Sequence, residues 1–286
     1  MKKIIGSYRN GDYMVYICND GTKLRYSPYN NFHAQFPESI DLKISNRCNL
    51  NCPMCHEQST AAGKLANLNH PLLDSLRPYT ELALGGGNVF EHPDLENFLH
   101  RMKEQKVICN LTVNEQHFVQ YSEILKKWHK EELIHGIGVS IINNTSIAMW
   151  QDCVIHAVLG VTPISVITSC ITAGAKILLL GYKDFGRGKR YKERFNKEIQ
   201  SNINEVKKYI IDNYEEISFI SFDNLALEQL DIKSIVSPEE WERLYMGDDG
   251  SYTMYVDLVE EEYAISSISP RFKIDSNCID DLFNKL

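Results

Sequence analysis

Short apolar runs alternate with longer amphipathic segments between about residues 39 and 225. The segments 94–105, 115–130 and 192–214 repeat apolar residues every three or four positions, which predicts helices. The apolar runs predict strands at 40–44, 82–84, 107–113, 137–142, 153–159, 177–180 and 217–222. Strand–helix alternation repeated six or seven times is typical of a parallel sheet that is buried on both faces. We therefore expect an α/β fold whose sheet curves into a barrel or part of one.

The two ends of the chain depart from this alternation. Residues 13–18 and 23–26 alternate around Asn19-Asp20-Gly21, a strong hairpin signal, so residues 1–38 predict an N-terminal β-hairpin extension. Near the other end, the turn residues Gly247-Asp248-Asp249-Gly250 precede an alternating run at 252–259. We expect residues 226–286 to form a small C-terminal extension whose hairpin packs on the end of the barrel. Residues 39–225 are then the core barrel.

Composition limits the class of protein. Of 286 residues, 43% are hydrophobic and 24% charged, which is typical of a globular chain and excludes disordered or collagen-like proteins. No stretch approaches 18 consecutive apolar residues, so no transmembrane helix is expected. The N-terminal lysines precede an apolar run of only two residues, which does not resemble a signal peptide. We expect a cytoplasmic protein.

The charge balance limits the partners. The chain has 30 Lys and Arg against 38 Asp and Glu, a net charge of −8. The basic segments 126–130 and 183–194 are short and lie among acidic residues, so the sequence lacks the basic stripe that neutralises phosphates. Stable nucleic-acid binding is therefore not expected, and a small molecule or a peptide is the expected substrate.

The spacing of the cysteines indicates the chemistry of the protein. Three of the eight cysteines, Cys48, Cys52 and Cys55, lie within one short segment, and the others are scattered singly. Clustering of this kind in a cytoplasmic protein indicates a metal site rather than disulfides. Spacings of four and three residues let one loop present three thiolates to an iron–sulfur cluster, whose fourth iron would lack a protein thiolate. A zinc site completed by His56, or core cysteines without a ligand, are the alternatives.

The motif Cys48-x3-Cys52-x2-Cys55 after the first barrel strand resembles that of the radical S-adenosylmethionine (SAM) superfamily. The resemblance covers roughly residues 39–225 and implies a partial (β/α)6 barrel. It also implies a [4Fe-4S] cluster held by the three cysteines, whose fourth iron binds the amino and carboxylate groups of SAM. In that family one electron cleaves SAM to methionine and a 5′-deoxyadenosyl radical, which abstracts hydrogen from the substrate. A flavodoxin- or ferredoxin-type donor would supply the electron.

Further segments are similar to the SAM-binding positions of that family. Gly85-Gly86-Gly87-Asn88 follows the second strand and resembles the family's Gly-Gly-Glu-Pro segment, with Asn88 where the pattern has Glu. Asparagine can accept a hydrogen bond from an ammonium group, but it lacks the charge. The glycines permit close backbone approach to a ligand. The resemblance also assigns SAM contacts to Met54, Asn114, Ser140, Gly160, Gly181, Tyr182, Lys183 and Arg187.

Polar residues at the carboxyl ends of the predicted strands are candidates for substrate chemistry. His56 and Glu57 follow the cysteine motif, and Asp223 ends the seventh strand, where it can hold a substrate group or cap a helix. Cys278 is a candidate hydrogen-donating thiol. Glu91 and His92 are interpreted as helix-entry residues.

The function expected from the sequence is hydrogen abstraction from a small polar metabolite or nucleotide by a single-cluster radical SAM enzyme. A second cysteine cluster is missing from the C-terminal part of the sequence, which argues against sulfur insertion. A peptide-modifying enzyme and a glycyl-radical activase are the alternatives of the same class. From a different class, the chain can be a metal-binding module that has lost catalysis, for which Asn88 is the main argument.

Overall fold

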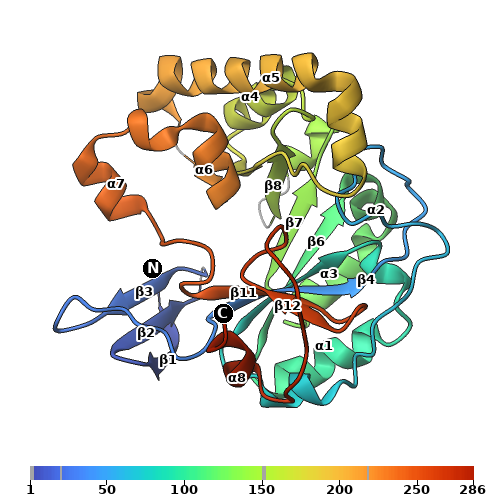
Figure 1. The fold of residues 1–286 in the computed structure, drawn as a ribbon, viewed down its shortest axis with the longest axis vertical. Coiled ribbons are helices and arrows are strands. Elements are labelled where there is room, and N and C mark those ends of the chain that lie inside the picture. Colours follow the sequence, from blue (N-terminus) through green and yellow to red (C-terminus); the bar gives the residue numbers. More distant parts are fainter. Residues whose placement is uncertain (1–2, 20, 150–152, 218) are drawn as a thin grey trace.

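The computed structural model describes residues 3–19, 21–149, 153–217 and 219–286. An antiparallel sheet of three strands begins the chain, formed by β1 (Ile4–Asn10), β2 (Tyr13–Cys18) and β3 (Lys23–Tyr26) in that order (Figure 1). The predicted hairpin is confirmed as β2 and β3, and β1 adds a strand that was not predicted. Asp20 in the hairpin turn lies outside the described residues.

A mostly parallel sheet of ten strands forms the rest of the framework, in the order β10-β9-β8-β7-β6-β5-β4-β11-β12-β13. The seven predicted strands are all present, although residue 218 in the last of them lies outside the described part. They are β4 (Ser39–Ser45), β5 (Glu81–Gly86), β6 (Ile108–Asn114), β7 (Gly136–Ser140), β8 (Cys153–Val158), β9 (Lys176–Leu180) and β10 (Ile220–Phe222). Parallel pairing joins each to the next, so all seven carboxyl ends lie at one edge.

Helices connect these strands and follow the sheet around its convex side (Figure 1). The predicted segment 115–130 forms two helices rather than one, because the backbone leaves helical geometry at Tyr121. The helix predicted at 192–214 begins earlier, at Arg187. The α-helices are α1 (Leu95–Glu104), α2 (Glu115–Gln120), α3 (Ser122–Lys130), α4 (Ile164–Thr172), α5 (Arg187–Asn213), α6 (Asn224–Leu230), α7 (Pro238–Leu244) and α8 (Ile279–Phe283). Five 3₁₀ turns complete the described elements: η1 (Pro71–Ser75), η2 (Val89–Glu91), η3 (Thr145–Met149), η4 (Tyr214–Glu216) and η5 (Ile232–Ser234).

The two faces of the large sheet differ in burial and polarity: one face is buried, whereas the other, which was also predicted to be buried, is mostly half-buried. One face carries the apolar core, with residues such as Leu42, Leu84 and Val139 fully buried against the helices. The alternate positions face the other way and are mostly polar or small, as in β4, where Asp41 is exposed between buried Ile40 and Leu42. Since side chains alternate along a strand, a single register places the polar positions on the concave face.

The C-terminal extension joins the sheet instead of packing on its end. Strand β11 (Thr253–Asp257) pairs in parallel with β4, on the side opposite β5. It then forms the predicted hairpin with β12 (Glu262–Ala264), which is followed by β13 (Phe272–Lys273). The strand order runs in a line from β10 to β13, and within the described residues these two edges do not pair with each other.

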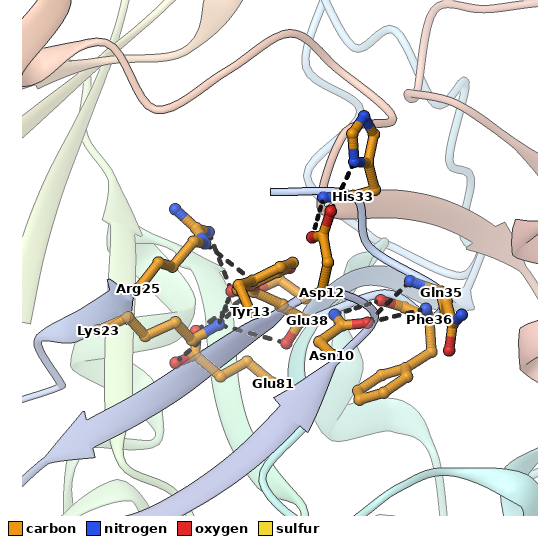
Figure 2. Close-up of polar contacts among 11 residues, drawn as sticks. Asn10, Asp12, Tyr13, Lys23, Arg25, His33, Gln35, Phe36, Glu38 and Glu81 are labelled. Atoms are coloured by element: carbon orange, nitrogen blue, oxygen red, sulfur yellow. Dashed lines mark hydrogen bonds and ion pairs between the residues drawn. The ribbon is translucent and has the colours of Figure 1, made fainter. Parts of the chain in front are cut away.

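A buried ion network attaches the N-terminal sheet to the amino ends of β4 and β5 (Figure 2). Glu38, which is 1% exposed, accepts hydrogen bonds from Tyr13 at 2.6 Å and from two nitrogens of Arg25 at 2.9 Å. Lys23 pairs with Glu81 at 3.4 Å, so both strands are tied to the small sheet. Burial and the Glu38 hydrogen bond raise the pKa of Tyr13. This network lies at the edge of the sheet opposite the carboxyl ends of the strands.

Candidate functional site

The three clustered cysteines lie on the segment that follows the carboxyl end of β4. Cys48, Cys52 and Cys55 are free thiols and are half-buried. Burial and the neighbouring thiols raise the pKa values of Cys48 and Cys52, so the three side chains interact electrostatically. Four of the other cysteines, Cys18, Cys109, Cys153 and Cys170, are buried. The half-buried thiols are therefore concentrated on this segment, which we call the cysteine loop (residues 46–60).

The spacing of the thiols does not favour a single metal ion. Sulfur ligands around a tetrahedral zinc are about 3.8 Å apart, given a Zn–S bond of about 2.3 Å. Among the described residues, the three Sγ atoms do not all lie within 4.8 Å of one another, and His56 does not complete such a group. An iron–sulfur cluster spaces its cysteine sulfurs more widely, because each thiolate binds a different iron. The separation of the three thiols is thus compatible with a cluster.

The end of β5 holds the first part of the cysteine loop. The Gly87 N–H donates to the Ser45 carbonyl at 2.6 Å, and the Asn88 N–H donates to the Arg47 carbonyl at 2.7 Å. A Cβ atom on Gly86 would lie 2.3 Å from the Ser45 oxygen, and one on Gly87 would lie 2.2 Å from the Arg47 oxygen. Both positions therefore require glycine because the backbone of Ser45 and Arg47 passes so close. In this structure the two glycines approach the backbone of Ser45 and Arg47, and their predicted approach to a ligand stays a prediction.

The first residue of α5, Arg187, holds the second part of the cysteine loop. The Arg187 guanidinium donates from Nε to the Cys52 carbonyl at 3.0 Å and from both terminal nitrogens to the Ser59 carbonyl at 3.0 Å. Its backbone N–H donates to the Cys55 carbonyl at 3.2 Å. Arg187 thus organises the backbone between and beyond the thiols, which is a role that the sequence did not reveal. Its contact with SAM stays a prediction.

A buried charge network connects the cysteine loop to β4 and β11. Lys43 on β4 forms ion pairs with Glu57 at 2.7 Å and with Asp257 on β11 at 3.0 Å, and His56 bonds to Glu57 at 3.1 Å. Burial raises the pKa of Glu57, but the hydrogen bond from His56 and the charge of Lys43 outweigh it and hold that pKa well below its usual range. Of the predicted catalytic candidates, His56 and Glu57 are brought together here.

Lys43 and Asp257 were missed in the sequence because they lie inside apolar strands. Asp41, Lys43 and Ser45 occupy every second position of β4, which was the available signal for a polar face. Asp41 is exposed in the middle of a central strand, and in the described structure its carboxylate forms no hydrogen bond or ion pair. Burial and nearby carboxylates nevertheless raise its pKa, so Asp41 faces a hollow rather than open solvent.

Lys183 extends over this concave face from the end of β9. Its ammonium donates to Ser267 Oγ at 2.7 Å, on the segment between β12 and β13. Burial, together with the charge of Lys183, lowers the pKa of His156 on β8 to about 4. A pocket of about 510 Å³ opens beside Lys183, between the 182–185 loop, α5 and α6. Pockets of this size accept small molecules.

The remaining predicted contacts of SAM lie at the same edge of the sheet. Asn114 and Ser140 are paired neighbours at the ends of β6 and β7, and the Asn114 side chain also caps α2 through the Gln116 N–H at 2.9 Å. The Tyr182 hydroxyl donates to the Gly188 carbonyl at 2.6 Å, and burial raises its pKa to about 12. Met54 lies on the cysteine loop. Gly160 and Gly181 donate backbone hydrogen bonds to Asn202 and Asp223.

Two other candidates have structural partners away from the thiols. Asp223 accepts hydrogen bonds from the N–H groups of Gly181 at 2.9 Å and Ala226 at 2.7 Å, so it caps α6. Cys278 precedes α8, which packs against η1, at the edge of the sheet where β5 begins. That position is opposite the cysteine loop and does not favour a hydrogen-donating role.

No model of a known protein family matches the chain, and no curated protein matches its sequence. Among the described residues, every helix is too short or too polar to cross a lipid bilayer. Function therefore has to be inferred from the residues of the site.

Proposed function

We propose that the protein is a single-cluster radical SAM enzyme in which Cys48, Cys52 and Cys55 bind a [4Fe-4S] cluster. One observation carries the proposal. Three half-buried free thiols lie on one loop at the carboxyl edge of a parallel sheet, and that loop is held by the residues after β5 and by the first residue of α5. Active sites of sheets with this connectivity lie at that edge. The open sheet of seven successive parallel strands supports a partial barrel.

The cluster and SAM would supply a 5′-deoxyadenosyl radical, formed when one donated electron breaks the sulfonium carbon–sulfur bond and leaves methionine. The chain's own residues would bind the cluster and SAM and orient them. Arg187 and Gly87 fix the backbone that carries the thiols, and the Lys43–Glu57 pair holds the end of the cysteine loop against β4. Positioning of this kind is the protein's share in cofactor chemistry.

The substrate class that we propose is a small polar metabolite or nucleotide. The polar concave face and the pocket of about 510 Å³ beside Lys183 support it, because they offer charged groups in a space of small-molecule size. Among the described residues, no comparable feature supports a peptide substrate or a partner protein that receives a radical.

Anaerobic reconstitution with iron and sulfide tests the proposal. After reduction and addition of SAM, the wild type should produce 5′-deoxyadenosine, and Cys52→Ala should lose it together with the cluster. Cys278→Ala is the matched control, since it removes a half-buried thiol at the opposite edge. A wild type that holds a reducible four-iron cluster but shows neither product nor a SAM-induced change in its EPR spectrum would overturn the assignment and leave a metal-binding module.

A further inference from the structure

We propose that Lys183 and Arg271 bind an anionic group of the substrate, a carboxylate or a phosphate, at the concave face of the sheet. The inference rests on the proposed function, since it narrows the substrate of that enzyme to an anion. Lys183 follows β9, and Arg271 directly precedes β13. Arg271 thus belongs to the C-terminal extension, outside the residues 39–225 that resemble the radical SAM superfamily.

The segment between β12 and β13 (residues 265–271) forms a turn that reaches the loop after β9. The Ser269 N–H donates to the Ser266 carbonyl at 3.2 Å, and the hydroxyls of these two serines form a hydrogen bond of 2.9 Å. Ser267, which is buried, is therefore a central residue of a tight turn. Since Ser267 accepts a hydrogen bond from Lys183, the turn and the loop after β9 meet at this serine.

Two cationic side chains converge on Ser267. The Lys183 ammonium donates to its hydroxyl at 2.7 Å, and the Nη2 atom of Arg271 donates to its carbonyl at 2.6 Å. Within the described part of the chain, neither cation forms an ion pair with a carboxylate. Like charges that are drawn together repel each other, so an anion that contacts both would lower the electrostatic energy of the pair.

Arg271 keeps an unused hydrogen-bond donor. Its guanidinium lies 4.0 Å from the centre of the Tyr255 ring, on the strand that pairs with β4. Its Nη1 atom is buried, yet no atom of the described residues accepts a hydrogen bond from it. A buried donor without an acceptor destabilises the protein. A carboxylate or phosphate oxygen would supply the missing acceptor, and the planar guanidinium suits the geometry of both groups.

The nearby carboxylates do not neutralise these two cations. Glu57 accepts a hydrogen bond from the Tyr255 hydroxyl at 3.3 Å, but it is already paired with Lys43 at 2.7 Å. Asp223 accepts two backbone N–H groups and caps α6. Asp41 is the register partner of Tyr255 on β4, and its carboxylate forms no ion pair in the described structure. The positive charge of the pair is therefore available to a ligand.

The pocket of about 510 Å³ gives a ligand access to Lys183. Ile268, the residue after Ser267, also lines this pocket, so the turn forms part of its wall. Two further charged side chains of the lining, Asp184 and Lys192, pair with each other at 2.9 Å. Among the described residues, Lys183 is thus the cation of the pocket that lacks a carboxylate partner. A ligand that enters here meets Lys183 beside the turn that carries Arg271.

Equilibrium dialysis of the anaerobically reconstituted protein against labelled inorganic phosphate and labelled succinate tests the site. Arg271→Gln removes the charge but keeps a hydrogen-bonding side chain, so we expect binding of the preferred anion to weaken by about tenfold or more. Lys183→Gln changes the other cation, on a distant segment, and should weaken binding to a similar extent. Lys273→Gln is the matched control, because Lys273 is 72% exposed in a surface pair with Glu262. It should change binding by less than about twofold. Iron content should be equal in all four proteins.

The two anions distinguish the substrates that share this chemistry. Tighter binding of phosphate would indicate a phosphorylated substrate, and tighter binding of succinate would indicate a carboxylic acid. A wild type that binds neither anion, unchanged binding in Arg271→Gln, or an equal loss in Lys273→Gln would overturn the anion site while the proposed function stands. Anion binding that depends on Arg271, in a protein that shows neither 5′-deoxyadenosine nor a SAM-induced change in its EPR spectrum, would overturn the proposed function and leave the anion site.

Discussion

Protonation of His156 should destabilise the folded protein below pH 6.5. His156 lies on the concave face of β8, and burial with the charge of Lys183 lowers its pKa to about 4, against about 6.5 in an unfolded chain. The unfolded chain therefore takes up the proton first as the pH falls. The stabilisation is complete above pH 6.5 and is lost as the pH falls toward 4. Between pH 8 and pH 5 the loss amounts to about 2 kcal/mol, at 1.36 kcal/mol per pKa unit.

Urea unfolding of the reduced, iron-free protein at pH 8 and pH 5 measures this loss. His156→Gln removes the titrating ring, so the wild type should lose about 2 kcal/mol more than the variant between the two pH values. Lys183→Met should reduce the difference, because one of the two causes that lower the pKa of His156 is then removed. An identical pH dependence in wild type and His156→Gln would refute the reasoning and show that water solvates the ring in the folded protein.

Two further substitutions test the contacts that hold the framework together. Gly87→Ala places a Cβ 2.2 Å from the Arg47 oxygen, so it should lower the unfolding free energy by about 1–3 kcal/mol and reduce the iron content after reconstitution. Gly85→Ala is the control: its Cβ would have its nearest contact at 3.9 Å, so stability and iron content should stay unchanged. Glu38→Gln leaves the half-buried Arg25 without its carboxylate, so it should lower the urea stability by about 3 kcal/mol. Asp12→Asn removes a carboxylate from an exposed pair, so it should cost much less. Equal costs for Glu38→Gln and Asp12→Asn would contradict the importance of the buried network.

The strands and the cysteine loop could be predicted because their signals are local. An apolar run such as 177–180 indicates a buried strand wherever it lies, and the spacing of Cys48, Cys52 and Cys55 shows that one loop presents three thiols. The polarity of the two sheet faces was misjudged because Asp41 and Lys43 were grouped with the apolar residues between them. Counted separately, they follow the period of two that a strand requires.

The contacts that complete the candidate site could not be read from the sequence, because they join distant segments. Nothing near Arg187 indicates that its guanidinium binds carbonyl groups of the cysteine loop 128 and 135 positions earlier. The parallel pairing of β11 with β4 likewise depends on which strand edge remains free after the other strands have assembled. Glu91 was interpreted as a helix-entry residue, and its ion pair with Arg47 at 4.0 Å forms only when β4 and β5 pair.

The position of Arg187 in the chain has a consequence for biogenesis. The thiols are synthesised early, but the side chain that fixes their loop comes 135 residues after Cys52 and reaches it only when the strands between β4 and β9 are in place. A nascent chain that ends before β9 carries all three cysteines on a segment that Arg187 does not yet hold. Under the proposed function, insertion of iron would be coupled to completion of the sheet, and the folded framework, rather than the cysteine motif alone, would decide when the protein can receive the cluster.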